Sequence, residues 1–381
     1  MVDIRAVGRG ATVLGLGGAL ATAGAAVGFG MERYVMGRAL GGADPVANEP
    51  LGGLRGTPYA VEASDGVQLH VEVDGDHEPG LTVVFAHGFA LNHDCWHFQR
   101  RDLRRTARLV FYDQRSHGRS GRAPQDETSV ERLGRDLGEI VDVLVPPGPV
   151  VLVGHSMGGM SVMALAEQRP ELFGERVVGV GLVATSAMLA AGEDIGLGAR
   201  VAGIARRVGP PVLATASRQA DIVESLRRTG SDLGYVLTKR YSFSRADIAP
   251  SLVEFVAARV SGPPGEVLSD FLPHLTTLDS RTALAALSEA HTLVIGAGGD
   301  RITPVQHSRD IVTEILDAGY LEVPDAGHMV MLEHPDLVTA HLRSLIARST
   351  HDTTEAIDDP GVAPVPLPRP SKRRRRSRKQ S

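Results

Sequence analysis

The feature that most constrains the fold of this chain is the pentapeptide Gly154-His155-Ser156-Met157-Gly158. It directly follows the short apolar run 149–153, which is rich in valine and predicts a buried strand, and residues 157–167 predict a helix. A Gly-x-Ser-x-Gly motif between a strand and a helix is typical of a nucleophile elbow, a sharp turn that holds a serine hydroxyl clear of the sheet. In this context we interpret Ser156 as a candidate nucleophile rather than as an incidental serine in a glycine-rich turn.

Short apolar runs alternate with helical patterns on both sides of this motif. An antiparallel hairpin around Asp65-Gly66 is expected first. The predicted strands are 59–64, 67–73, 81–86, 108–112, 150–153, 177–184, 292–296 and 320–323, and the predicted helices are 97–105, 130–144, 157–167, 305–318 and 335–348. This alternation predicts an α/β protein with a mostly parallel sheet, helices on both faces, and active groups at the carboxyl ends of the strands.

The alternation stops between residues 186 and 289, where helical segments are expected at 199–208, 218–228 and 248–260 but no strand. We interpret 186–289 as an inserted helical cap, and 59–185 with 290–348 as the α/β core. Residues 41–58, rich in glycine and proline, are expected to be a linker. The polar, then proline-rich, then basic stretch 349–381 is expected to be a disordered tail.

The N-terminal region contains a stretch of 22 residues, 10–31, without a charged side chain. This length suffices to span a bilayer, although glycine and alanine make the stretch only weakly hydrophobic. Our favoured interpretation of segment 1–40 is therefore an N-terminal anchor that gives membrane contact through residues 10–31. The alternatives are a cleaved signal peptide, which would make the protein secreted, and a buried or interfacial helix.

Charge and cysteine content restrict the partners. The net charge is −5, yet eight Lys and Arg residues and no acid lie between 360 and 381, so the rest of the chain is more acidic than this value implies. An acidic body argues against nucleic acid as the main partner. We interpret the basic run as a solvated tail, with contact to an anionic membrane as the first alternative and contact to nucleic acid as the second. The single cysteine, Cys95, excludes an internal disulfide and a multi-cysteine metal site, and we expect neither metal nor cofactor.

A serine nucleophile needs a base, and the base needs a carboxylate that orients it. Asp300 follows the predicted strand 292–296, and His328 follows the predicted strand 320–323. The order Ser156, Asp300, His328 is the one expected for an elbow on such a sheet. Asp325 is the rival acid, but it lies only three residues from His328 on the same loop and would have to fold back.

Two backbone N–H groups are expected to stabilise an oxyanion. One is that of Met157, directly after the nucleophile. The other is that of Phe89, in the turn His87-Gly88-Phe89-Ala90 after the strand 81–86. We interpret His87 itself as a residue that shapes this loop rather than as a catalyst.

These features together resemble the α/β-hydrolase superfamily, in the branch with a helical cap, from about Tyr59 to Arg348. The resemblance implies an eight-stranded, mostly parallel sheet and a structural role for Asp113. One departure is Ser116, where the family commonly has glycine. The matching stretches are His87-Gly88-Phe89, Tyr112 to Ser120, Gly154 to Gly159, Gly296 to Asp300 and Gly327 to Pro335.

The resemblance also narrows the chemistry. Epoxide hydrolases and haloalkane dehalogenases of this superfamily use aspartate at the elbow, whereas a serine suits attack on a carbonyl and an acyl-enzyme. We therefore predict a serine hydrolase of carboxylic esters or related acyl compounds. Perhydrolase (haloperoxidase-like) activity and hydrolytic C–C cleavage use the same triad and stay open, as does a hydrolase-like protein that binds a ligand without turnover. The predicted cap, with few aromatic residues, favours a small-molecule substrate with an apolar acyl chain.

Overall fold

The computed structural model describes residues 44–75, 80–189, 234–262 and 265–351. The predicted helices 199–208 and 218–228, the stretch 10–31 and the basic run near the C-terminus lie outside these residues. Among the described residues, none of the helices has both the length and the apolar character that crossing a membrane requires.

An eight-stranded sheet organises the molecule, in the order β1-β2-β4-β3-β5-β6-β7-β8. β1 and β2 form the expected hairpin and β2 is antiparallel to β4, whereas all other neighbours are parallel. The strands are β1 (Thr57–Glu62), β2 (Gln68–Asp74), β3 (Thr82–Ala86), β4 (Arg108–Tyr112), β5 (Val150–His155), β6 (Val177–Val183), β7 (His291–Ala297) and β8 (Gly319–Val323). The α/β fold class and the mostly parallel eight-stranded sheet are thereby confirmed.

Helices cover both faces of this sheet because its central strands are apolar on both sides. Val150 and Leu152 of β5 belong to one buried cluster, and the alternating Val151 and Val153 belong to a second. The first cluster includes residues of α3 (Val130–Leu144), α4 (Met157–Gln168), α8 (Gly265–Leu275), α9 (Ala283–Leu287) and α10 (Val305–Glu314). The second includes residues of α2 (His97–Leu103), α7 (Pro250–Val260), α11 (Val330–Glu333) and α12 (Pro335–His351).

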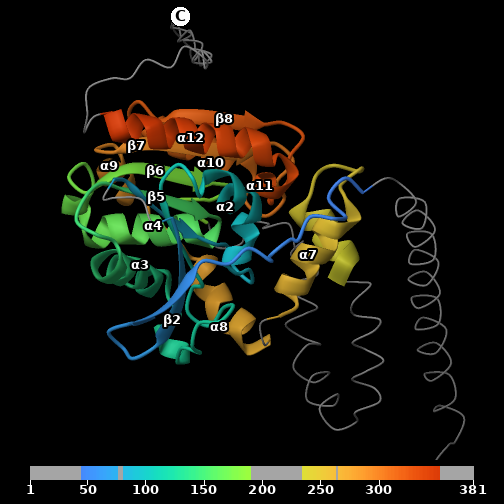
Figure 1. Cartoon of the computed structure of the whole chain (residues 1–381), viewed down its shortest axis with the longest axis horizontal. Helices are drawn as coiled ribbons and strands as arrows, with labels where there is room; N and C mark the ends of the chain where they lie inside the picture. Colours follow the sequence, from blue (N-terminus) through green and yellow to red (C-terminus); the bar gives the residue numbers. More distant parts are fainter. Residues whose placement is uncertain (1–43, 76–79, 190–233, 263–264, 352–381) are drawn as a thin grey trace, which may run out of the picture.

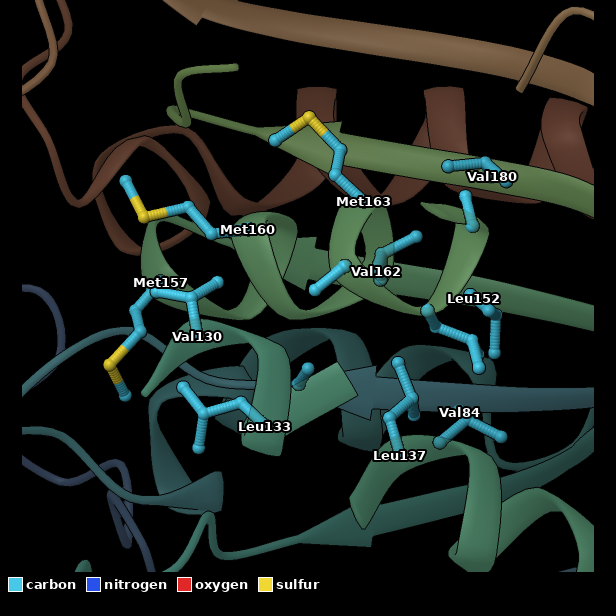
Figure 2. Packing of buried hydrophobic residues seen from close by; sticks show 14 of the residues in the cluster. Val84, Val130, Leu133, Leu137, Leu152, Met157, Met160, Val162, Met163 and Val180 are labelled. Carbon is cyan, nitrogen blue, oxygen red and sulfur yellow. The ribbon is translucent and has the colours of Figure 1, made fainter. Parts of the chain in front are cut away.

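Helix α4 starts directly at the serine motif and is buried from Met157 to Ala166. Figure 2 shows Met157, Met160 and Met163 of this helix among Val and Leu side chains of α3 and the strands. A helix that is apolar all round belongs in a protein interior. The start of α4 is therefore held rigidly at the end of β5, where the candidate nucleophile lies.

The described part of the predicted cap is helical. Residues 234–242, α7 and α8 are helices, and this part of the chain contains only an isolated bridge, between Met188 and Asp279. In Figure 1, α7 lies to the right of the sheet and α8 below it, both away from α9. The role of residues 186–289 as a cap stays a prediction.

Three predicted boundaries differ from the structure in particular. Residues 44–58, expected to be linker, instead pack on the body: Glu49 lies 2.8 Å from the His97 ring, Leu51 packs against the second buried cluster, and β1 already starts at Thr57. The predicted helix 305–318 ends at Glu314, because the backbone is already extended at Ile315 (φ −99°, ψ 117°), and Asp317 follows with a left-handed φ of 58°. In addition, α12 continues to His351, beyond the residue where the tail was expected to start.

Candidate active site

The serine motif forms a strained turn between β5 and α4. Ser156 has φ 53° and ψ −119°, a conformation that non-glycine residues rarely adopt. A Cβ at Gly154 would strike the backbone of Gly158, and a Cβ at Gly158 would strike the carbonyl of Ala86. Both glycines of the motif are thus required by close backbone contacts, and the geometry is that of a nucleophile elbow.

Asp300 and His328 lie together, as predicted, although they come from different loops. His328 Nδ1 lies 2.8 Å from Asp300 Oδ2, and both side chains are buried. In this contact Nδ1–H donates a hydrogen bond to Asp300. The opposite ring nitrogen, Nε2, is then unprotonated and has the lone pair that a base needs. The rival Asp325 is largely exposed and lies beside His334, at 3.4 Å.

The Asp300 carboxylate is fixed by a local turn that the sequence analysis did not single out. Oδ1 accepts hydrogen bonds from the N–H groups of Ile302 (2.8 Å) and Thr303 (2.9 Å). The buried Thr303 hydroxyl lies 2.9 Å from Oδ2 and 3.3 Å from His328 Nδ1, and also 2.9 Å from the Ala184 carbonyl. The signal for Thr303 is its position three residues after an aspartate that ends a strand.

The histidine loop is also held next to the serine turn. His155, the neighbour of Ser156, donates from Nε2 to the His328 carbonyl at 3.0 Å, and the two ring centroids are 4.7 Å apart. Burial lowers the pKa of His155 well below its usual value, so this ring is neutral. Within the described residues, the Ser156 hydroxyl makes no hydrogen bond with the His328 ring, so the proton relay itself stays a prediction. Such contacts are often long without substrate.

The two predicted oxyanion donors belong to segments that lie close together. Neither the Phe89 nor the Met157 amide donates to an acceptor among the residues that the structure describes, so both are available to a ligand. Gly88 permits the close approach of their two segments, because a Cβ there would lie 2.7 Å from His155 Nδ1 and 3.2 Å from Ser156 Cβ.

His87 shapes the loop that carries Phe89. The Gln114 amide donates to His87 Nε2 at 2.9 Å, so Nδ1 carries the proton and donates to the Gly88 carbonyl at 2.8 Å. Burial lowers the pKa of His87 to about 3. Both ring nitrogens of His87 are hydrogen-bonded and the ring is neutral. His87 is therefore a structural residue of the oxyanion turn, as we call residues 87–90.

The hydroxyl of Thr185, which the sequence analysis did not single out, holds the backbone of Ser156. Thr185 follows β6 and donates from Oγ1 to the Ser156 carbonyl at 2.7 Å. Its side chain packs where a Cβ at Gly159 would collide. Thr185 thereby fixes the backbone of the elbow from the neighbouring strand.

The segment after β4 is structural. Asp113 accepts from the backbone and ring of His93 (2.9 and 2.8 Å) and from the Arg119 amide (2.8 Å). Ser116, where a glycine is common in the family that the chain resembles, has a left-handed φ of 63°. Its hydroxyl accepts from the Ala123 amide at 2.9 Å, which stabilises this conformation.

One group of side chains has the spacing of a metal site: His70, His93 and Asp113. A nitrogen of the Arg119 guanidinium lies 3.2 Å from His70 Nε2 and 2.8 Å from the carboxylate of Glu72, next to this group. A protein cation therefore already lies beside these donors, and their network of hydrogen bonds and ion pairs accounts for their arrangement. We assign no metal to them.

A family model described as the alpha/beta hydrolase family matches residues 83–341, which is more than half of the chain. The chain belongs to this α/β hydrolase family. Its members are built as observed here, on a sheet with helices on both faces and a nucleophile on a strand-to-helix turn.

Individual relatives are enzymes. The chain is 26% identical over 272 residues to 3-oxoadipate enol-lactonase 1 of Acinetobacter baylyi, covering 71% of this chain and 90% of that protein. It is 26% identical over 282 residues to the pimeloyl-acyl-carrier-protein methyl ester esterase of Nitrosospira multiformis, covering 72% and 97%. Among solved structures, a thermophilic esterase from Thermogutta terrifontis matches with a TM-score of 0.58 at 26% identity, covering 77% of this chain and 99% of that one. This hydrolase is accordingly an enzyme of the same superfamily.

Proposed function

We propose that this α/β hydrolase cleaves carboxylic esters or related acyl compounds through an acyl-enzyme on Ser156. The observation that carries the proposal is the Asp300–His328 pair, 2.8 Å apart at the ends of β7 and β8, beside a serine held in the elbow conformation. The names of the relatives support the substrate class, since an enol-lactonase and a methyl ester esterase both act on ester bonds.

In the proposed reaction, His328 Nε2 takes the proton of Ser156 as its Oγ attacks the carbonyl carbon. The negative charge that develops on the carbonyl oxygen accepts hydrogen bonds from the N–H groups of Phe89 and Met157. The protonated His328 then donates its proton to the departing alkoxide, which leaves an acyl-enzyme. Water, activated by the same ring, attacks the acyl carbon and frees Ser156.

Asp300 has two tasks in this scheme. It accepts a hydrogen bond from the Nδ1–H group, which fixes the ring orientation and the tautomer, and its charge stabilises the imidazolium that forms as the serine proton moves. Two backbone N–H groups hold its other oxygen, so the carboxylate enters the reaction already oriented.

The described part of the inserted segment supports an apolar acyl chain. Phe271 of α8 is fully buried, and its ring centroid lies 6.3 Å from that of Phe89, which carries an oxyanion donor. Val267 of the same helix is buried in the same cluster. These side chains make the surroundings of the Phe89 turn apolar, which agrees with a substrate that carries an apolar acyl group.

Two measurements test the proposal. A fluorophosphonate probe should label the wild-type protein and should fail to label Ser156→Ala, because the probe reacts with an activated serine. p-Nitrophenyl esters of graded chain length should be hydrolysed by the wild type, with faster turnover of the longer apolar acyl groups. Labelling that survives Ser156→Ala, or an inert wild-type protein, contradicts the proposal. Hydrolysis that requires hydrogen peroxide would point instead to a perhydrolase.

A further inference from the structure

Beyond the triad, the structure contains a buried carboxylate that joins two separate parts of the site. Glu333 ends α11, five residues after His328, and is 8% exposed. Oε1 accepts a hydrogen bond from the Gly327 amide at 2.7 Å, directly before the catalytic histidine. The same carboxylate accepts from the amides of Ser244 (3.1 Å) and Arg245 (3.3 Å), in the inserted segment. We call this set of contacts the Glu333 bridge.

Residues 242–245 also touch both catalytic loops by backbone packing. The Met329 amide donates to the Ser242 carbonyl at 2.9 Å. A Cβ at Gly327 would lie 2.6 Å from the carbonyl carbon of Phe243, and a Cβ at Gly299 would strike the Ser244 side chain. The loops that carry Asp300 and His328 are therefore closely packed against one short stretch of the insertion.

The bonding of Glu333 is unusual for a buried acid. In the part of the chain that the structure describes, its carboxylate bonds only to backbone N–H groups, while the side chain of the neighbouring Arg245 is paired with Asp247 at 2.9 Å. Burying a charge is costly unless hydrogen bonds compensate, and charged acceptors bind amides more strongly than neutral ones. A carboxylate used in this way fixes the distance between the loops that supply the amides.

We propose that Glu333 is a positioning residue that couples the inserted segment to the catalytic base. Through the Glu333 bridge, the loop of His328 keeps its place relative to Ser156 only while residues 244 and 245 are bound to the same carboxylate. Contacts of a substrate with the insertion then affect the placement of the base. This role rests on the proposed function of His328.

The first test measures the reaction. Glu333→Ala and Glu333→Gln are compared with Glu322→Gln, which removes a carboxylate that β8 pairs with Arg309. We expect kcat/KM for a p-nitrophenyl ester to fall 10- to 100-fold in Glu333→Ala and less in Glu333→Gln, because a glutamine oxygen still accepts from Gly327. The control should keep the wild-type rate.

The second test needs no activity. Hydrogen–deuterium exchange should be faster at the amides of residues 244, 245 and 327 in Glu333→Gln than in the wild type or in Glu322→Gln. Unchanged exchange overturns the Glu333 bridge. Faster exchange with a wild-type kcat/KM in both Glu333 variants overturns the positioning role. If Glu333→Ala does not fold, both tests are carried out with Glu333→Gln.

The two proposals can fail separately. A wild-type protein that is inert to esters and to fluorophosphonate would refute the proposed function. Hydrogen–deuterium exchange would still test the Glu333 bridge in that case.

Discussion

At the scale of single residues, the candidate site depends on hydroxyl groups that are not themselves catalytic. Thr303 contacts Asp300 twice, through its amide and its hydroxyl, and its hydroxyl also lies 3.3 Å from His328 Nδ1. Thr185 binds the carbonyl of Ser156 from the next strand. Each hydroxyl restrains one member of the triad, so the arrangement is fixed before substrate binds.

Replacing Thr303 tests this arrangement. Thr303→Val keeps the shape of the side chain and removes the hydroxyl, whereas Thr303→Ser keeps the hydroxyl. A hydrogen bond to a charged group contributes about 1.5–3 kcal/mol, so we expect Thr303→Val to lower kcat/KM for an ester roughly 10-fold or more. Thr303→Ser should remain within about threefold of the wild type. Equal rates for Thr303→Val and the wild type would show that the hydroxyl does not hold Asp300.

A candidate triad could be proposed from the sequence because the ends of predicted strands are strong signals. Ser156, Asp300 and His328 each follow an apolar run, and the ends of parallel strands meet at one edge of a sheet. Glu333 and Thr303 have no comparable signal. Glu333 binds backbone amides, and the Thr303 hydroxyl lies near the Ala184 carbonyl as well as the Asp300 carboxylate. The sequence does not show which backbone groups the fold brings near a side chain.

At the scale of elements, glycine at a helix contact explains how α4 is held in place. α3 and α4 pack closely, and a Cβ at Gly134 would lie 2.8 Å from the Cβ and backbone of Ala164. A Cβ at Gly138, one turn later, would meet mainly the flexible end of Leu165, at 3.1 Å. In the sequence, Gly134 and Gly138 are both simply residues that weaken a helix. Only the packed structure shows that Gly134 is needed at the contact with Ala164.

Alanine at these two positions should therefore have opposite effects. Alanine favours a helix over glycine by about 1 kcal/mol, whereas overpacking against backbone costs about 1–3 kcal/mol. We expect Gly134→Ala to lower the free energy of unfolding by about 1–2 kcal/mol, and Gly138→Ala to leave it unchanged or raise it by up to about 1 kcal/mol. Urea unfolding measures both. A Gly134→Ala protein as stable as the wild type would contradict the close helix contact.

The sequence predicted the positions of the strands more accurately than the ends of the helices. β4 and α3 were predicted to the residue, because strand propensity and a serine cap, Ser129, mark their limits. The end of α10 was placed too late, since Ile315 and Ala318 continue the apolar pattern although the backbone leaves the helix at Ile315. A hydrophobic pattern records burial, and burial continues past the last helical turn.

At the scale of the whole molecule, acid residues join the first strands to the body. Glu72 of β2 is 1% exposed and binds the Gly56 amide, Arg100 and Arg119, at 3.0, 2.7 and 2.8 Å. Burial alone would raise the pKa of Glu72, but these amide and guanidinium partners, with the charge of His93, lower it from 4.5 to about 2.

This lowering predicts a specific loss of stability in acid. The pKa of Glu72 is lower in the folded protein than in the unfolded chain. The contribution of ionised Glu72 to the free energy of unfolding is therefore fully present above pH 4.5 and is lost as the pH falls towards 2. A change from 4.5 to about 2 corresponds to about 3 kcal/mol. We expect the free energy of unfolding of Glu72→Gln to be about 3 kcal/mol lower than that of the wild type at pH 7. At pH 3 this difference should be less than half as large. Glu62→Gln, at an exposed position, serves as the control. A difference that is the same at both pH values would contradict the lowered pKa of Glu72.

The last prediction concerns the N-terminus, where the sequence suggested both an anchor and a linker. The linker was placed at 41–58, yet Asp44 binds Ser251 at 2.9 Å and Glu49 binds His97 at 2.8 Å. Glycine and proline content indicates irregular backbone but does not reveal whether that backbone packs on the body. A truncation after the proposed anchor must therefore begin at residue 44 rather than at 59.

We expect full-length protein to be recovered with membranes and a protein that starts at residue 44 to be soluble, because the uncharged stretch 10–31 is removed. The shorter protein should keep the ester-hydrolysing activity and unfold at the temperature of the full-length one. A protein that starts at residue 59 should unfold at a lower temperature, since it lacks the contacts of Asp44 and Glu49 and the start of β1. Fractionation, intact mass and thermal unfolding measure these outcomes. Full-length protein with an intact N-terminus in the soluble fraction would refute the anchor, and a mass shortened by the uncharged stretch would instead identify a cleaved signal.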